Sequence, residues 1–206
     1  TRTPLTILRT HLEGFEDGII DMTPEEIKTC ENQIENITLI ITNMSGMLDA
    51  DKEIDQVKYE EFELNQLLKQ VVGGLKVQFD KKNIELKLTS DKKIVMNTDK
   101  YKLSQSIYNI LTNAYKFTEK NGKVTLSYGI IKEEIVISIE DTGIGMNSED
   151  KKHIFDAYYK GSNSSKSTGE GLGLYIVKEN LDKINGTIDV VSELGAGSKF
   201  TITIPM

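Results

Sequence analysis

The stretch NILTNAYKFT, residues 109–118, combines two asparagines, a lysine and a run of apolar residues. Asn109 and Asn113 lie four residues apart, so on a helix they stand one turn apart and share a face. Their neighbours are apolar, which places the two amides at the rim of a buried face, with Lys116 and Phe117 just beyond. Two amide oxygens and water can hold Mg²⁺ beside phosphates, and Lys116 can add positive charge. The alternative is that both asparagines are solvated surface residues.

A second stretch, EDTGIGM at residues 140–146, puts Asp141 directly after a predicted strand and before Gly143 and Gly145. A carboxylate at a strand end can accept a hydrogen bond from an exocyclic amine, and it would repel a carbonyl oxygen at the same place. Such a site would prefer adenine to guanine, and the glycines would let the backbone approach a flat base closely. Taken alone, Asp followed by Gly also makes an ordinary turn.

The third stretch, TGEGLGLYIVKEN at residues 168–180, runs through Gly169, Gly171 and Gly173 into a helix expected to begin near Leu172. Free amides at a helix start, with the positive end of its dipole, form a cradle for phosphate. A flexible loop before a helix is the alternative. The chain has no GxxxxGK[ST] sequence, and these glycines do not follow a strand inside a βαβ unit. Two common phosphate-binding motifs are therefore excluded.

Alternating and helical periodicities surround the three stretches. The predicted strands are residues 83–88, 123–129, 133–140, 186–192 and 198–204, with a short strand just before residue 65. The predicted helices are residues 65–79, 99–118 and 171–184. Helices interspersed with hairpin-connected strands predict an α+β fold, a sandwich in which helices cover one face of a mixed sheet.

The first 48 residues have a different, heptad-like rhythm, in which apolar residues step by three and four. The first stripe contains Leu5, Leu8, Leu12, Phe15 and Ile19, and the second contains Ile27, Cys30, Ile34, Ile37, Ile41, Met44 and Leu48. Thr23 can cap the second helix, with Pro24 in its first turn. We therefore predict an antiparallel helical hairpin, and a homodimer in which two hairpins pair into a four-helix bundle through residues 1–48. The alternative is that both stripes pack on the rest of the same chain.

Composition narrows the classes of function. The chain has 206 residues, a formal net charge of −7 and one cysteine, Cys30. The acidic balance argues against nucleic acid as a partner, and a single cysteine excludes an internal disulfide framework and fits a reducing compartment. The sequence has no apolar run as long as a membrane span and no signal peptide. These features predict a cytoplasmic location, and we expect a fragment because the sequence does not begin with Met.

In order and spacing, the three stretches together resemble the Bergerat-type ATP-binding domain shared by histidine kinases, gyrase-type topoisomerases, Hsp90-type chaperones and MutL-type repair proteins. The resemblance covers residues 59–206, and residues 1–52 and 53–58 are then a helical hairpin and a linker. HIFDAYYKG at residues 153–161 resembles the family's phenylalanine box, and GAGSKF at residues 195–200 resembles its closing glycine box. The resemblance implies that ATP and Mg²⁺ bind, with residues 146–170 as a lid that orders over the nucleotide.

The resemblance also implies a role for each candidate site residue. The adenine pocket would contain Asp141, Gly143 and Gly145, and the metal ligands would be Asn109 and Asn113. Lys116 and Lys160 would approach phosphate. The phosphate cradle would be formed by Gly169, Gly171, Leu172 and Gly173.

The residue at position 109 distinguishes the branches of this family. By resemblance, the hydrolysing branches carry a glutamate four residues before the metal asparagine, where it activates water as a general base. Here that position is Asn109, which cannot accept a proton at neutral pH. The kinase branch is therefore favoured, because it needs only to position the γ-phosphate and compensate its charge.

The opening TRTPL, residues 1–5, is similar to the tail of the His-Glu-x-Arg-Thr-Pro-Leu motif on the first hairpin helix of sensor histidine kinases. The phosphoacceptor histidine would then precede Thr1, and the fragment would be unable to autophosphorylate. Thr3 falls where many members place a residue that positions water for dephosphorylation of the partner, although it could simply shape the helix start. His11 and His153 are expected to be surface residues.

The sequence as a whole predicts the transmitter part of a sensor histidine kinase. The γ-phosphate would pass to a histidine and then to an aspartate in the receiver domain of a response regulator. The parent protein would be anchored in a membrane only through segments outside this chain. The alternatives are a serine or pyruvate-dehydrogenase-type kinase of the same superfamily and a non-catalytic dimeric scaffold that binds nucleotide.

Overall fold

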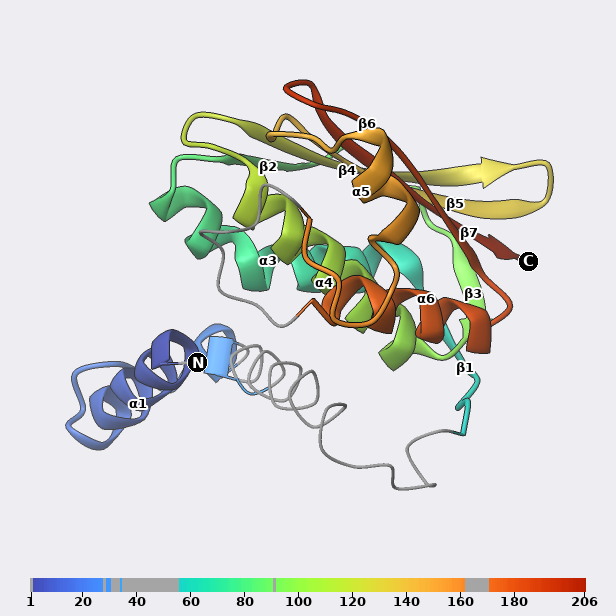
Figure 1. Ribbon diagram of the computed structural model, residues 1–206. Helices are drawn as coiled ribbons and strands as arrows, with labels where there is room; N and C mark the ends of the chain where they lie inside the picture. Colours follow the sequence, from blue (N-terminus) through green and yellow to red (C-terminus); the bar gives the residue numbers. More distant parts are fainter. Residues whose placement is uncertain (1, 28, 31–33, 35–55, 91, 162–170) are drawn as a thin grey trace. The chain divides into compact units, whose positions relative to one another are not determined.

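The computed structural model describes residues 2–27, 29–30, 34, 56–90, 92–161 and 171–206 (Figure 1). The chain forms two compact units, Thr1–Asp55 and Gln56–Met206. The larger unit contains all three motif stretches of the sequence.

A five-stranded mixed sheet forms one layer of the larger unit. Its strands lie in the order β2 (Glu85–Leu88), β4 (Lys123–Ile131), β5 (Glu134–Asp141), β7 (Gly197–Pro205) and β6 (Thr187–Glu193). β2 pairs with β4 in parallel, and the other neighbours pair antiparallel. Lys132 and Glu133 both have positive φ at the turn between β4 and β5, as a tight two-residue hairpin requires. In this register Asp141 ends β5 opposite Ser198 of β7.

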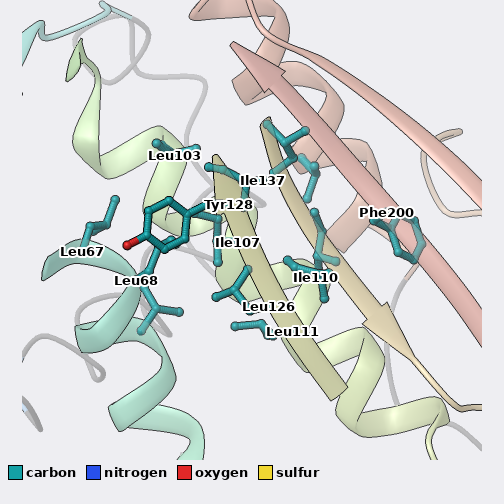
Figure 2. Close-up of a cluster of buried hydrophobic side chains, with 14 of the residues drawn as sticks. Leu67, Leu68, Leu103, Ile107, Ile110, Leu111, Leu126, Tyr128, Ile137 and Phe200 are labelled. Carbon is teal, nitrogen blue, oxygen red and sulfur yellow. The ribbon is translucent and has the colours of Figure 1, made fainter. Parts of the chain in front are cut away.

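Three helices cover one face of this sheet, namely α3 (Leu64–Lys81), α4 (Lys100–Phe117) and α6 (Gly173–Lys183) (Figure 1). The core lies between the two layers, where alternate residues of the strands meet the apolar stripes of the helices. Figure 2 shows this contact, with Leu126, Tyr128 and Ile137 from the sheet and Ile107 and Ile110 from α4. The predicted α+β sandwich is confirmed.

Two elements of the larger unit were not predicted. β3 (Val95–Thr98) pairs antiparallel with β1 (Glu60–Glu63) in a separate two-stranded sheet. α5 (Ser148–His153) lies inside the segment predicted to be the lid. A helix of six residues is too short for its periodicity to stand out, and the sequence VMNT of β3 does not alternate between apolar and polar residues.

The smaller unit contains α1 (Arg2–Glu16), and residues 24–27, 29–30 and 34 are also helical. Thr23 Oγ1 accepts a hydrogen bond from Glu26 N–H at 3.2 Å, which confirms the predicted cap. α1 ends before Ile19, because the chain turns at Gly18 with φ of +67°. The predicted apolar positions Ile37, Ile41, Met44 and Leu48 lie outside the described residues.

Several apolar side chains of the smaller unit are exposed, including Leu5 (51%), Leu12 (54%) and Ile34 (52%). None of the helices in the described part of the chain is both long and apolar enough to span a membrane.

Candidate functional site

Helix α4 presents the asparagines to the start of α6. Asn109 is buried, and its Nδ2 donates a hydrogen bond to the carbonyl oxygen of Gly173 at 3.3 Å. Asn113, one turn further along α4, is half-buried, and its Nδ2 lies 3.9 Å from the point that a Cβ on Gly173 would occupy. Two motif stretches that are far apart in the sequence therefore meet in the fold.

Both ends of α4 are fixed by side chains. Asp99 Oδ1 accepts a hydrogen bond from Lys102 N–H, and Asp99 Oδ2 accepts one from Lys58 N–H, each at 2.9 Å. At the other end Lys82 Nζ donates to the carbonyl oxygens of Tyr115 (2.7 Å) and Lys116 (3.3 Å). These contacts cap the helix and hold its polar face in place. The sequence reasoning missed Asp99 and Lys82, although an Asp just before an apolar helical run is a recognisable cap signal.

Asp141 stands at the end of β5 with only 7% of its surface exposed. Its Oδ1 accepts a hydrogen bond from Gly143 N–H at 2.8 Å. Burial raises the pKa of Asp141, and the backbone N–H groups of Gly143 and Ser198 partly offset this effect. The site therefore holds a desolvated carboxyl group beside a glycine-rich turn.

The two glycines after Asp141 are required by protein contacts. A Cβ on Gly143 would lie 2.6 Å from the carbonyl oxygen of Phe117, the last residue of α4. Gly145 has φ of +63°, and a Cβ there would overlap the backbone carbonyl of Glu193. The sequence reasoning ascribed these glycines to the approach of a base, whereas the structure shows that each also lets two backbone segments pack together.

The second glycine stretch leads into α6. Gly171 has φ of +78°, and a Cβ there would lie 2.5 Å from the carbonyl oxygen of Tyr159. Leu172 is the N-cap residue of α6, and its side chain makes no capping hydrogen bond. The first amides of α6 are therefore suited to an anion. Gly169 lies outside the described residues.

Lys116, one of the two predicted phosphate-binding lysines, has a lowered pKa. Burial lowers the pKa of Lys116, and the positive charge of Lys160 lowers it further. Lys116 Nζ also lies 5.4 Å from the centroid of the Phe117 ring. The charge of Lys160, on the segment after α5, therefore acts on Lys116 near the end of α4. This arrangement attracts an anion.

A buried carboxylate organises the first part of the predicted lid. Asp150 accepts hydrogen bonds from Tyr159 Oη at 2.8 Å and from Asn147 Nδ2 at 3.0 Å. Asn147 Oδ1 in turn accepts from Glu149 N–H and Asp150 N–H, which caps α5. The carbonyl oxygen of Tyr159 lies close to Gly171, the residue that follows the predicted lid, so this cluster lies beside the start of the second glycine stretch that the structure describes.

Ser192 of β6 connects the turn after Asp141 to the β6–β7 turn. Ser192 Oγ accepts a hydrogen bond from Met146 N–H at 2.9 Å and donates one to the carbonyl oxygen of Gly197 at 2.8 Å. Lys151 Nζ donates to the carbonyl oxygen of Ser192 at 3.0 Å. The sequence reasoning missed this residue, since a serine in an alternating strand carries no distinctive signal.

The donor groups of this region fit a nucleotide and a magnesium ion. Within the residues that the structure describes, no group of three or more His, Cys, Asp or Glu could hold a metal ion. Mg²⁺ is commonly held by few protein oxygens together with phosphate oxygens and water, and the amides of Asn109 and Asn113 suit that role. Thr3, the remaining candidate, lies in the first turn of α1 in the smaller unit.

Residues 98–206 match the family model described as "Histidine kinase-, DNA gyrase B-, and HSP90-like ATPase", which covers more than half of the chain. The chain therefore belongs to this family, and it contains the ATP-binding domain of a sensor histidine kinase.

Individual proteins agree with this assignment. The chain is 28% identical over 211 residues to the sensor histidine kinase WalK of Bacillus subtilis, a match that covers 99% of this chain and 34% of WalK. It thus spans about a third of the length of that relative. A crystal structure of full-length ShkA in complex with AMPPNP has a TM-score of 0.68 at 25% identity, over 90% of this chain and 40% of ShkA. The histidine kinase ThkA in complex with the response regulator TrrA has the same fold, with a TM-score of 0.64 at 21% identity over 99% of this chain and 58% of ThkA.

Proposed function

We propose that this chain is the transmitter part of a sensor histidine kinase, which binds ATP with Mg²⁺ and delivers the γ-phosphate to a histidine. The observation that carries the proposal is the hydrogen bond between Asn109 and Gly173. It places the polar face of α4 against the uncapped start of α6, where phosphate and metal would have to meet. The AMPPNP bound to ShkA supports a nucleotide at this fold.

Each candidate residue has one task in this proposal. Asp141 accepts a hydrogen bond from the exocyclic amine of adenine, and Gly143 and Gly145 beside it let the backbone approach the base. Lys116 and Lys160 compensate phosphate charge, and the amides of Gly169, Gly171, Leu172 and Gly173 hold phosphate oxygens. The carbonyl oxygens of Asn109 and Asn113 would hold Mg²⁺, which would neutralise charge on the phosphates.

Transfer rather than hydrolysis is proposed because of Asn109. A side-chain amide does not accept a proton from water at neutral pH, and in this structure the amide nitrogen already donates to Gly173. The chain's own residues therefore orient the nucleotide and balance its charge, which phosphoryl transfer to an external nucleophile requires.

The acceptor and the partners belong to the same proposal. A histidine on the helical hairpin of residues 1–52 would receive the phosphate, and an aspartate in a receiver domain would receive it next, with residues 53–58 as the linker to residues 59–206. The ThkA–TrrA complex supports a response regulator as partner. We further propose that residues 1–48 mediate homodimerisation, that Thr3 assists dephosphorylation of the regulator, and that the parent protein is cytoplasmic in this part and anchored in a membrane elsewhere.

Calorimetry with nucleotides tests the binding half of the proposal. The 206-residue chain should bind ATP in the presence of MgCl₂, with affinity in the range of about 1 μM to 1 mM that is usual for enzyme substrates. GTP should bind more weakly, because its carbonyl oxygen would face the Asp141 carboxylate. A folded chain that takes up no ATP at millimolar concentration would refute the proposal.

A mixing experiment tests the transfer half. The chain is incubated with radiolabelled ATP and a separate helical hairpin that carries a phosphoacceptor histidine. Acid-labile phosphate on the hairpin is the expected product, and acid-stable phosphate would instead favour a serine kinase of the same superfamily. Binding of ATP without any transfer would favour a nucleotide-binding scaffold.

A further inference from the structure

A buried polar contact joins α4 to α6 outside the motif stretches. Asn180 Nδ2 on α6 donates a hydrogen bond to Gln105 Oε1 on α4 at 2.7 Å. Gln105 has only 5% of its surface exposed, and Asn180 has 7%. Buried side-chain amides are costly unless they are hydrogen-bonded, so a pair of them between two helices calls for a physical reason.

The position of Gln105 on α4 suggests that reason. Gln105, Asn109 and Asn113 follow one another at steps of four residues, so they form one stripe along the helix. Gln105 contacts Asn180, and Asn109 contacts Gly173. Residue numbers thus rise along α4 as they fall along α6, so the two helices run antiparallel to each other. The two helices, which Figure 1 shows in the same layer, are thus joined at two separate points.

We propose that Gln105 and Asn180 are positioning residues of the nucleotide site, which fix the register of α4 against α6. Two hydrogen bonds at separate points prevent the helices from sliding or rotating, whereas apolar packing alone is not directional. The contact thereby keeps Asn109 and Asn113 opposite the start of α6, where the phosphates and Mg²⁺ would lie. This inference rests on the proposed binding of ATP with Mg²⁺ at that place.

The test uses the full chain and four variants. Gln105→Leu and Asn180→Leu each leave one buried amide without this partner, and the double variant replaces both amides by apolar groups. The exchange variant, Gln105→Asn with Asn180→Gln, keeps two amides and the same total number of side-chain carbons. Ile107→Val on α4 is the control, because it removes a buried methylene group and no polar contact.

The readout is the magnesium gain, defined as the ratio of the ATP dissociation constants measured by calorimetry without and with MgCl₂. Adenosine serves as a separate probe of the Asp141 pocket, and thermal melting reports stability. The double leucine variant should remain folded and bind adenosine like the wild type, but its magnesium gain should fall by about tenfold, as is usual when a supporting contact of a metal site is lost. The exchange variant should recover the magnesium gain. Ile107→Val should lower the melting temperature and leave the magnesium gain unchanged.

Two results would overturn the inference. One is a magnesium gain equal to that of the wild type, measured in the folded double leucine variant or in either single variant. The other is a folded exchange variant that has lost the gain. If the variants with leucine do not fold, the exchange variant still decides the question. The proposed function fails separately, in the wild type itself, if the unaltered chain shows no ATP binding or no magnesium gain.

Discussion

At the scale of single residues, Asp141 shows how a proposed binding group can reduce the stability of the unliganded protein. Burial raises the pKa of its carboxyl group, so ionisation of Asp141 in the folded chain is less favourable than in the unfolded chain. The contribution of this raised pKa to the free energy of unfolding is fully present below the pKa of the unfolded chain, about 3.9. It is lost as the pH rises through the higher pKa of the folded chain. At neutral pH the folded protein therefore carries a carboxylate that is partly desolvated.

The substitution Asp141→Asn tests both consequences. ATP affinity should fall by about 10- to 100-fold, since a hydrogen bond to a charged group contributes about 1.5–3 kcal/mol. Without nucleotide, the variant should be more stable relative to the wild type at pH 7 than at pH 4, because only the wild type carries the cost of ionisation. Calorimetry and urea unfolding between pH 4 and 8 measure the two effects. A stability difference that does not vary with pH would contradict the raised pKa.

Gly145 and Gly195 offer a matched pair at the same scale. Both have positive φ, but a Cβ on Gly145 would overlap the Glu193 carbonyl, while a Cβ on Gly195 would meet no described atom within 4 Å. Gly195→Ala should cost about 1–2 kcal/mol of unfolding free energy, the price of left-handed backbone alone. Gly145→Ala should cost clearly more, because the turn after Asp141 must move away from β6. Urea unfolding compares them, and equal losses would mean that the contact with Glu193 is easily relaxed.

At the scale of elements, the asparagine helix α4 depends on caps from two other segments. Asp99 lies at its start and also binds the backbone of Lys58, in the segment that precedes β1. Lys82, just after α3, binds the carbonyl oxygens at its end. The orientation of the face that carries Asn109 and Asn113 is thus set by residues that lie outside the proposed nucleotide site.

Substitutions at Asp99 should distinguish the contributions of its two hydrogen bonds to stability. Asp99→Ala removes both acceptors and should lower the unfolding free energy by about 1–2 kcal/mol, the usual cost of a lost N-cap. Asp99→Asn keeps one acceptor oxygen for Lys102 N–H and should lose less. Asn147→Ala, at the cap of the short α5, serves as the comparison, because its effect should remain local. Urea unfolding gives the values, and identical losses for Ala and Asn at position 99 would argue against the cap.

At the scale of the whole molecule, the smaller unit exposes apolar side chains that its described residues do not cover. Leu5, Leu12 and Ile34 each expose about half of their surface. An exposed apolar stripe on a helical hairpin is typical of helices that pair with a second copy. This feature supports the proposed homodimer, while the larger unit has its own continuous core.

Sedimentation equilibrium tests the dimer with two substitutions that add the same charge. Leu12→Glu lies on the apolar stripe and should shift the chain to monomer. Thr10→Glu, at an exposed polar position of the same helix, should leave the dimer intact. A wild-type chain that stays monomeric at high concentration, or two variants that behave alike, would rule out pairing through this stripe.

Local spacing in the sequence was enough to predict much of this protein. The steps of three and four from Leu103 to Ala114, the alternation from Val124 to Tyr128 and the cap at Thr23 depend on neighbours within one turn or one strand, so the sequence alone determined them. The same periodicities indicated the α+β class, and the three motif stretches indicated the family, because each motif is a short continuous segment.

The contacts between residues far apart in the chain follow from the tertiary structure. Asn109 contacts Gly173, Gln105 contacts Asn180 and Gly145 packs against Glu193, and no local rule relates residues so far apart in the chain. Such contacts depend on how helices and strands of fixed shape pack around a common core, which places a side chain within a few ångströms of a partner or far from it. For the same reason, the elevated pKa of Asp141 follows from its burial in the folded chain, and its place after a strand in the sequence could only suggest that the group was there.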